Sequence, residues 1–109
     1  MSKPFLRGGI PELLRQARRI QEKLDNLKEE LKNREETVIS AGGRVSVTVT
    51  GDRKIKAIRV DQEMLKNEDL AMVEDLLVSS VNSALDKIDE LIKTETEKIT
   101  GGVDLPGFF

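Results

Sequence analysis

Residues 11–36 read PELLRQARRIQEKLDNLKEELKNREE, and this stretch decides the fold of the chain. Apolar residues recur in it at alternating steps of four and three, the spacing of a narrow stripe along one side of an α-helix that lies along another helix. The stripe, called the seam below, consists of Leu13, Ala17, Ile20, Leu24, Leu27 and Leu31. Pro11 suits the first helical position, and no further Gly or Pro interrupts the stretch. At 1.5 Å per residue the helix would be about 39 Å long, so part of it must project or be covered by a second chain.

The side of this helix opposite the seam is basic. With about 100° of rotation per residue, Arg15, Arg18 and Arg19 centre roughly 170° from the seam, and Lys23 flanks them. Two interpretations stay open at this point. The cations form an ordinary solvated face in which Glu22 is their partner, or they form a surface for a polyanion.

After this helix the periodicity changes from 3.5 to 2, which is typical of β-strands. We expect strands at residues 37–39, 44–50 and 53–60, with tight turns at Gly42-Gly43 and Gly51-Asp52. Connections this short predict an antiparallel meander with one buried face. In the third strand Ile58 and Val60 are two residues apart and so share one face of the sheet. Ile55 is an odd number of residues from both, so either a bulge lies near residues 56–57 or Ile55 packs on the second face.

Two helices are predicted after the strands. Asp61 is a candidate N-cap for a short helix, and Asn67 is a candidate N-cap for a long helix that runs to about Lys98 and stops at Gly101-Gly102. The apolar face of this long helix is broader than the seam, which favours it as the cover of the sheet. The order of elements predicts an α+β fold. We expect a single domain over residues 1–109, with a flexible lead-in at 1–10 and a C-terminal tail at 101–109.

Composition argues against catalysis. The chain has no His and no Cys, so a Cys–His pair, a Ser–His–Asp triad and a thiolate metal site are impossible. No glycine pair lies in a nucleotide-cradling motif, and the acidic clusters fit a solvated helix face better than a metal site. We therefore predict no catalytic residue, no metal, no cofactor and no small-molecule substrate. Without an 18-residue apolar run or a signal-peptide core, a cytoplasmic protein with no membrane contact is expected.

The formal net charge of −2 hides a strong asymmetry. Residues 1–60 hold 14 Lys or Arg against 8 acids, which sums to +6, whereas residues 61–109 hold 4 against 12, which sums to −8. A basic N-terminal half is compatible with a polyanionic partner in spite of the acidic total.

The ordered set of segments resembles the YbaB/EbfC family of small bacterial nucleoid-associated proteins. The segments that carry the resemblance are residues 13–17, 20–23, 41–47, 51, 58–61, 64–65, 74–77, 81–84, 100–102 and 105–108. They span nearly the whole chain, and their order is more specific than any one of them.

The resemblance implies a homodimer whose long helices project like the arms of tweezers and bind DNA with relaxed sequence preference. It implies a nucleoid-associated location in the cytoplasm and a role in nucleoid organisation and gene expression. Carried over to this chain, the DNA contacts fall on Arg15, Arg18, Arg19, Lys23, Lys87, Lys93 and Lys98. The seam would then serve the dimer or helix pairing.

One alternative belongs to another class of function. A coiled-coil-like module could bind another protein through the seam or through the acidic helix, without contacting DNA directly. The excess of acid after Asp61 favours this alternative, and the basic first half favours DNA.

Overall fold

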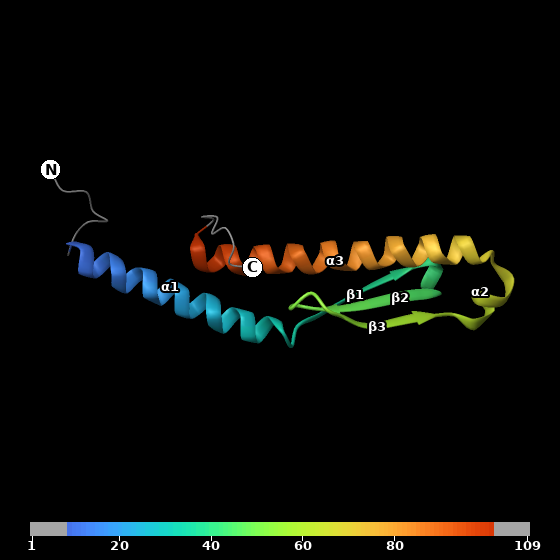
Figure 1. Cartoon of the computed structure of the whole chain (residues 1–109), viewed down its shortest axis with the longest axis horizontal. Coiled ribbons are helices and arrows are strands. Elements are labelled where there is room, and N and C mark those ends of the chain that lie inside the picture. Colours follow the sequence, from blue (N-terminus) through green and yellow to red (C-terminus); the bar gives the residue numbers. More distant parts are fainter. Residues whose placement is uncertain (1–8, 102–109) are drawn as a thin grey trace.

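The computed structural model describes residues 9–101, which form an elongated molecule of 73 × 24 × 20 Å (Figure 1). In chain order the elements are α1 (Gly9–Leu31), β1 (Glu35–Ser40), the 3₁₀ turn η2 (Ala41–Gly43), β2 (Val45–Thr50), β3 (Ile55–Val60), α2 (Gln62–Asn67) and α3 (Leu70–Thr100). The α+β fold predicted from the sequence is confirmed. The expected lead-in and tail lie outside the described residues, except for Gly9, Ile10 and Gly101.

The helix α1 has two unlike halves. Leu24, Leu27 and Leu31 are buried in the C-terminal half, which packs against α3. The N-terminal half extends past the C-terminal end of α3 (Figure 1). The predicted end of this helix at Glu36 is wrong. The helix ends at Leu31, because Glu35 and Glu36 pair with β2 and the hydrogen bonds of the sheet compete successfully with helix propensity.

The three strands form an antiparallel sheet in the order β1-β2-β3, as predicted. Val45, Val47 and Val49 of β2 are fully buried on one face of the sheet. A register shift between Thr48 and Val49 brings Ala57 opposite Thr48 and Ile55 opposite Val49. The extra residue is therefore Lys56, and this bulge turns Ile55 to the same face as Ile58.

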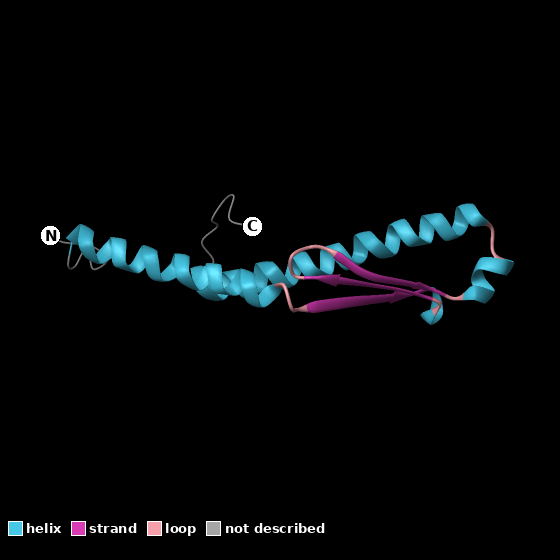
Figure 2. Ribbon diagram, turned by 60° about the horizontal axis from the view of Figure 1, so that its bottom comes forward, coloured by secondary structure: helices cyan, strands magenta, loops and turns pink. Residues whose placement is uncertain are grey.

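The helix α3 covers one face of the sheet, as expected, and leaves the other face bare (Figure 2). It packs on β1 and β2, where Ala84 and Ile88 join the valines of β2 in the core. A buried pair of hydroxyls, Ser40 Oγ and Ser80 Oγ at 2.7 Å, ties β1 to α3, and Ser80 also donates to the carbonyl of Leu76 at 2.7 Å. The strand β3 lies beside the part of the sheet that α3 covers.

Cap residues define the ends of the C-terminal helices. Asp61 is the N-cap of α2, as predicted, and its side chain accepts a hydrogen bond from the Glu63 N–H. The predicted cap of α3 at Asn67 is wrong. Asn67 still belongs to α2, since the Glu68 N–H donates to the Met64 carbonyl at 3.0 Å. Asp69 occupies the N-cap position of α3, but its side chain makes no capping hydrogen bond. Gly101 ends α3 in the left-handed conformation, at φ 68°.

Gly51 fixes the direction in which α1 leaves the body. A Cβ atom at this position would lie 2.0 Å from the carbonyl oxygen of Leu31. The Gly51 N–H donates to the carbonyl of Arg34 at 3.0 Å, so the β2–β3 turn is held directly under the end of α1. Only glycine allows this close approach of two backbone segments.

Candidate nucleic-acid interface

The projecting half of α1 carries the basic residues predicted from the sequence. Arg15, Arg18, Arg19 and Lys23 are all exposed, and they are called the arm strip below. Arg15 pairs with Glu12 at 3.1 Å. Over residues 9–101, no carboxylate lies within ion-pair distance of Arg18, Arg19 or Lys23. Most of the arm strip is therefore free to contact an anion from solvent.

The arm strip is confined to the N-terminal half of α1. Farther along the same side of the helix the exposed residues become acidic, with Asp25, Glu29 and Glu30 in place of the cations. The basic surface thus ends where α1 begins to pack on α3.

Two of the three lysines predicted on α3 lie near the same end of the molecule. Lys98 of α3 and Lys23 of α1 line one hollow of about 320 Å³, together with Glu30 and Glu95, and Lys98 pairs with Glu95 at 3.1 Å. Lys93 is exposed and has no ion pair within the described part of the chain. Each helix thus contributes one cation, Lys23 from α1 and Lys98 from α3, to the hollow where the projecting half of α1 begins.

Lys87 has a different environment. Its Nζ lies 3.5 Å from a carboxylate oxygen of Glu36 and 3.3 Å from the carbonyl oxygen of Thr37. Both partners belong to β1, so this lysine ties α3 to the edge of the sheet. The structure therefore separates Lys87 from the other predicted contacts.

The seam is divided in the same way as the helix. Leu24, Leu27 and Leu31 are buried within the chain, whereas Ala17 is exposed and Ile20 is 37% exposed. Leu13 is half-buried. Only the N-terminal part of the seam is thus accessible to a second chain.

The opposite end of the molecule is acidic. The segment from α2 to the first turns of α3 carries one cation, Lys66, against six acids: Asp61, Glu63, Glu68, Asp69, Glu74 and Asp75. This end lies far from the N-terminus of α1 along the longest axis (Figure 1). The charges therefore favour an anion at the arm strip and disfavour one on the surface of α2 and the first turns of α3.

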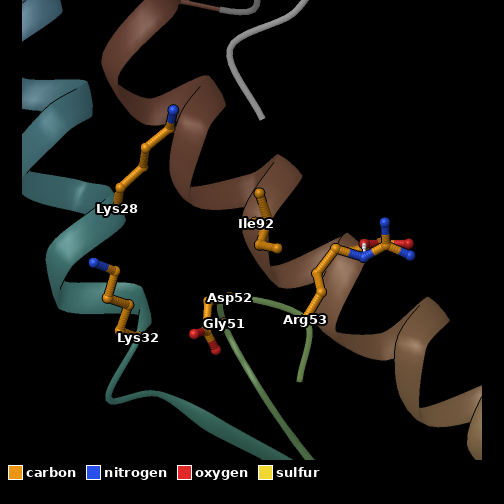
Figure 3. A pocket seen from close by; sticks show the side chains of 7 residues that line it. Lys28, Lys32, Gly51, Asp52, Arg53 and Ile92 are labelled. Atoms are coloured by element: carbon orange, nitrogen blue, oxygen red, sulfur yellow. Dashed lines mark ion pairs between the residues drawn. The ribbon is translucent and has the colours of Figure 1, made fainter. Parts of the chain in front are cut away.

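A further hollow lies between the end of α1, the β2–β3 turn and α3 (Figure 3). It has a volume of about 270 Å³ and is lined by Lys28, Lys32, Gly51, Asp52, Arg53, Asp89 and Ile92. Arg53 is held by Asp89 at 3.0 Å, and the amino groups of Lys28 and Lys32 point away from Asp52 in this view. These cations therefore do not converge on one ligand position.

The carboxyl group of Asp52 lies in this hollow beside Thr50. A hydrogen bond from the Thr50 hydroxyl lowers the pKa of Asp52 below its ordinary value, and nearby lysines act in the same direction.

Within residues 9–101, His, Cys, Asp and Glu side chains nowhere gather in threes in a way that could hold a metal ion. No helix in the same part of the chain has the length and apolar character needed to cross a bilayer.

Comparison with known proteins agrees with the fold. A nucleoid-associated protein of Clostridium acetobutylicum is 36% identical over 100 residues, which covers 92% of this chain and 89% of that protein. A nucleoid-associated protein of Acetivibrio thermocellus is 38% identical over 107 residues, covering 97% of this chain and 95% of the relative. The crystal structure of an uncharacterized protein from Helicobacter pylori shares the fold, with a TM-score of 0.74 at 23% identity, over 84% of this chain and 97% of that chain. The sequence profile of the YbaB/EbfC DNA-binding family matches residues 7–103, and the chain therefore belongs to this family.

Proposed function

We propose that this protein binds duplex DNA as a homodimer, mainly through backbone phosphates and with low sequence specificity. In the cell it would then act on the nucleoid, in DNA organisation and the regulation of gene expression. The observation that carries the proposal is the arm strip, an exposed set of cations with few acidic partners on a helix that projects from the body. The family and the names of the relatives support DNA as the ligand.

The mechanism rests on the release of counterions. Arg and Lys side chains that contact phosphates displace condensed cations from the duplex, and this term is independent of base sequence. The three aromatic residues of the chain are Phe5, Phe108 and Phe109, so residues 9–101 offer no aromatic ring to stack on a base. Three phosphate contacts per protomer in a dimer give a slope of log affinity against log salt of about −5.

A homodimer is supported by apolar surface that the chain leaves uncovered. Ile55 and Ile58 lie on the apolar face of the sheet, yet they are 48% and 46% exposed, because α3 covers β1 and β2 rather than β3. Val78 is 62% exposed and lies about three helical turns before Asp89, whose partner Arg53 is in the β2–β3 turn. The exposed side of α3 and the uncovered strand thus face the same region. A second copy related by a two-fold axis would cover it in both chains.

The dimer is tested by solution mass. Sedimentation equilibrium should give twice the chain mass of 12.2 kDa. Ile58→Asp should shift the mass toward one chain, because a carboxylate would be buried in the interface. Ile39→Asp is the matched control, since Ile39 is 68% exposed on the other face of the sheet. A single-chain mass for the unmodified protein, or equal masses for all three proteins, would contradict the proposed dimer.

DNA binding is tested by fluorescence anisotropy with a random-sequence duplex over a range of salt. Changing Arg15, Arg18 and Arg19 together to Ala should weaken binding by at least tenfold and flatten the salt slope, because up to six contacts of a dimer are lost. The control changes Lys32, Arg34 and Lys66 to Ala, which removes equal charge away from the arm. If both triple variants bind like the unmodified protein, the arm strip has no role in binding, and a protein-interaction module becomes the better account.

A further inference from the structure

A second set of cations meets on the bare face of the sheet, at the end next to α2. A hollow of about 370 Å³ lies there, and the 3₁₀ turn η2 forms one side of it. Its lining consists of Gly42, Gly43, Arg44, Ser46, Arg59, Val60 and Asp61. These residues belong to segments 41–47 and 58–61, for which no ligand contact was predicted from the sequence.

The strand register explains why these side chains share one face. Ser46 pairs with Arg59 and Val45 pairs with Val60, while the Asp61 N–H donates to the Arg44 carbonyl at 2.8 Å. Val45 is fully buried under α3, so Ser46, the next residue of β2, and its partner Arg59 in β3 point to the bare face. Arg44 ends η2 in a helical backbone conformation just before β2, and it lines the same hollow as Arg59.

The groups in this hollow are mainly hydrogen-bond donors. The Nε of Arg44 donates to the Ala41 carbonyl at 2.9 Å, which orients its guanidinium, and one terminal nitrogen lies 3.5 Å from Glu68. Arg59 has no ion pair with any described residue. The Ser46 hydroxyl lies beside it across the strand pair. Two guanidinium groups and a hydroxyl are the donors that proteins use for phosphate oxygens.

The backbone of η2 leaves room for a ligand. Gly42 and Gly43 have φ angles of 67° and 93°, and a Cβ atom added to either would meet nothing within 4 Å. An anion can therefore approach the backbone here without meeting a side chain. The one carboxylate in the lining, Asp61, already accepts a hydrogen bond from the Glu63 N–H as the cap of α2.

We infer that this hollow binds a phosphate group, and specifically a backbone phosphodiester of the duplex that the arm strip holds. The inference rests on the proposed function, and it extends the DNA contact from the arm to the sheet. Because the hollow and the arm lie at different ends of a molecule 73 Å long, the bound duplex would follow much of its length.

The experiment measures duplex affinity over a range of salt for Arg59→Ala. At about 0.1 M salt each lost phosphate contact should weaken binding roughly fivefold to tenfold, and the salt slope should become shallower by about 0.9 per contact. Lys66→Ala is the control, since it removes one exposed cation from the same end of the molecule but outside the hollow. Arg59→Lys should recover part of the loss, because the charge returns without the planar fork.

The variant Asp61→Asn should bind the duplex more tightly. Asparagine caps a helix as well as aspartate does, so the fold should persist while one negative charge leaves the hollow. Duplex affinity should rise roughly twofold to fivefold at low salt. Equal affinities and slopes for Arg59→Ala and Lys66→Ala, together with no gain in Asp61→Asn, would overturn the inference. Such a result leaves the proposed function intact if the arm triple variant still loses binding.

Free inorganic phosphate presents the same oxygen acceptors to this hollow as a phosphodiester of DNA. Inorganic phosphate, titrated at millimolar concentration and followed by the amide resonances of Gly42 and Gly43, separates the two. Competition between phosphate and duplex for these resonances supports the inference. Resonance shifts with phosphate alone, and none with duplex, would overturn the assignment to DNA.

Discussion

The two halves of α1 share one helix and differ in almost everything else. In the C-terminal half, Leu24, Leu27 and Leu31 are 0%, 8% and 1% exposed, and they belong to the apolar interior of the body. In the N-terminal half, the seam residue Ile20 is 37% exposed and Ala17 is exposed as well. A regular apolar stripe thus identifies a helix and its facing side, but it does not say how far the partner helix reaches. The end of α3 decides where the same stripe changes from core to surface.

The largest expected effect comes from equal truncations in the two halves. Leu31→Ala should lower the free energy of unfolding by about 2–5 kcal/mol, because it removes a buried side chain and leaves a cavity in the core. Leu14→Ala should lower it by less than about 0.5 kcal/mol. Urea unfolding at equal protein concentration measures both values. Similar losses in the two variants would show that the halves are equally packed in solution.

A somewhat smaller effect is expected at the junction between the arm and the body. Gly51→Ala should cost about 1–3 kcal/mol, because the new methyl group overlaps the carbonyl oxygen of Leu31 and the turn must move. The control is Gly42→Ala, where the methyl group has open space and only the positive φ opposes it. Thermal unfolding followed by circular dichroism compares them, and a more stable Gly51→Ala protein would contradict the close approach.

Two lysines of α3 should differ in the same way, one acting on stability and the other on DNA binding, with smaller effects. Lys87→Ala should destabilise the fold by up to about 1 kcal/mol, because its ion pair with Glu36 is exposed, and should leave duplex affinity unchanged. Lys93→Ala should leave stability unchanged and weaken duplex binding a few-fold at low salt. Paired unfolding and anisotropy measurements separate the two roles. A loss of DNA affinity in Lys87→Ala alone would reverse this assignment.

The smallest effect concerns acid pH. Because the pKa of Asp52 is below its ordinary value of 3.8, the carboxylate stabilises the folded state above that value, and the contribution is lost as pH falls through the lowered pKa. In Asp52→Asn this part of the pH dependence should be missing, with the other carboxyls unaffected. Urea unfolding at several pH values below 5 provides the comparison. Identical pH profiles for the two proteins would rule out a role for the Thr50 hydrogen bond.

Much of the fold was predictable from the sequence, because the periodicities are strong. The alternation of Val45, Val47 and Val49 predicted the buried strand, and the position of Asp61 predicted a cap. The ends of helices were less predictable. Residues up to Glu36 favour a helix by composition, and only pairing with β2, which is distant in sequence, ends it at Leu31. The face of the sheet on which Ile55 lies could be determined only from the register of β2 and β3.

The candidate site was predictable in part. The spacing of Arg15, Arg18 and Arg19 placed them on one side of a helix, and the structure adds that this side projects from the body. The different environment of Lys87 depends on its contact with β1, which no local pattern in α3 reveals. The convergence of Arg44 and Arg59 likewise depends on strand pairing.

The central claim is that the projecting half of α1, rather than the acidic surface of α2 and the first turns of α3, is the main DNA contact. Titration of the isotope-labelled full-length protein with a duplex, followed by amide resonances, tests it most directly. We expect the largest perturbations at Arg15, Arg18, Arg19 and Lys23, with smaller ones at Lys93, Lys98, Gly42 and Gly43 and little change over Glu74 and Asp75. Perturbations concentrated on α2 and the first turns of α3, with the arm strip unaffected, would contradict the account.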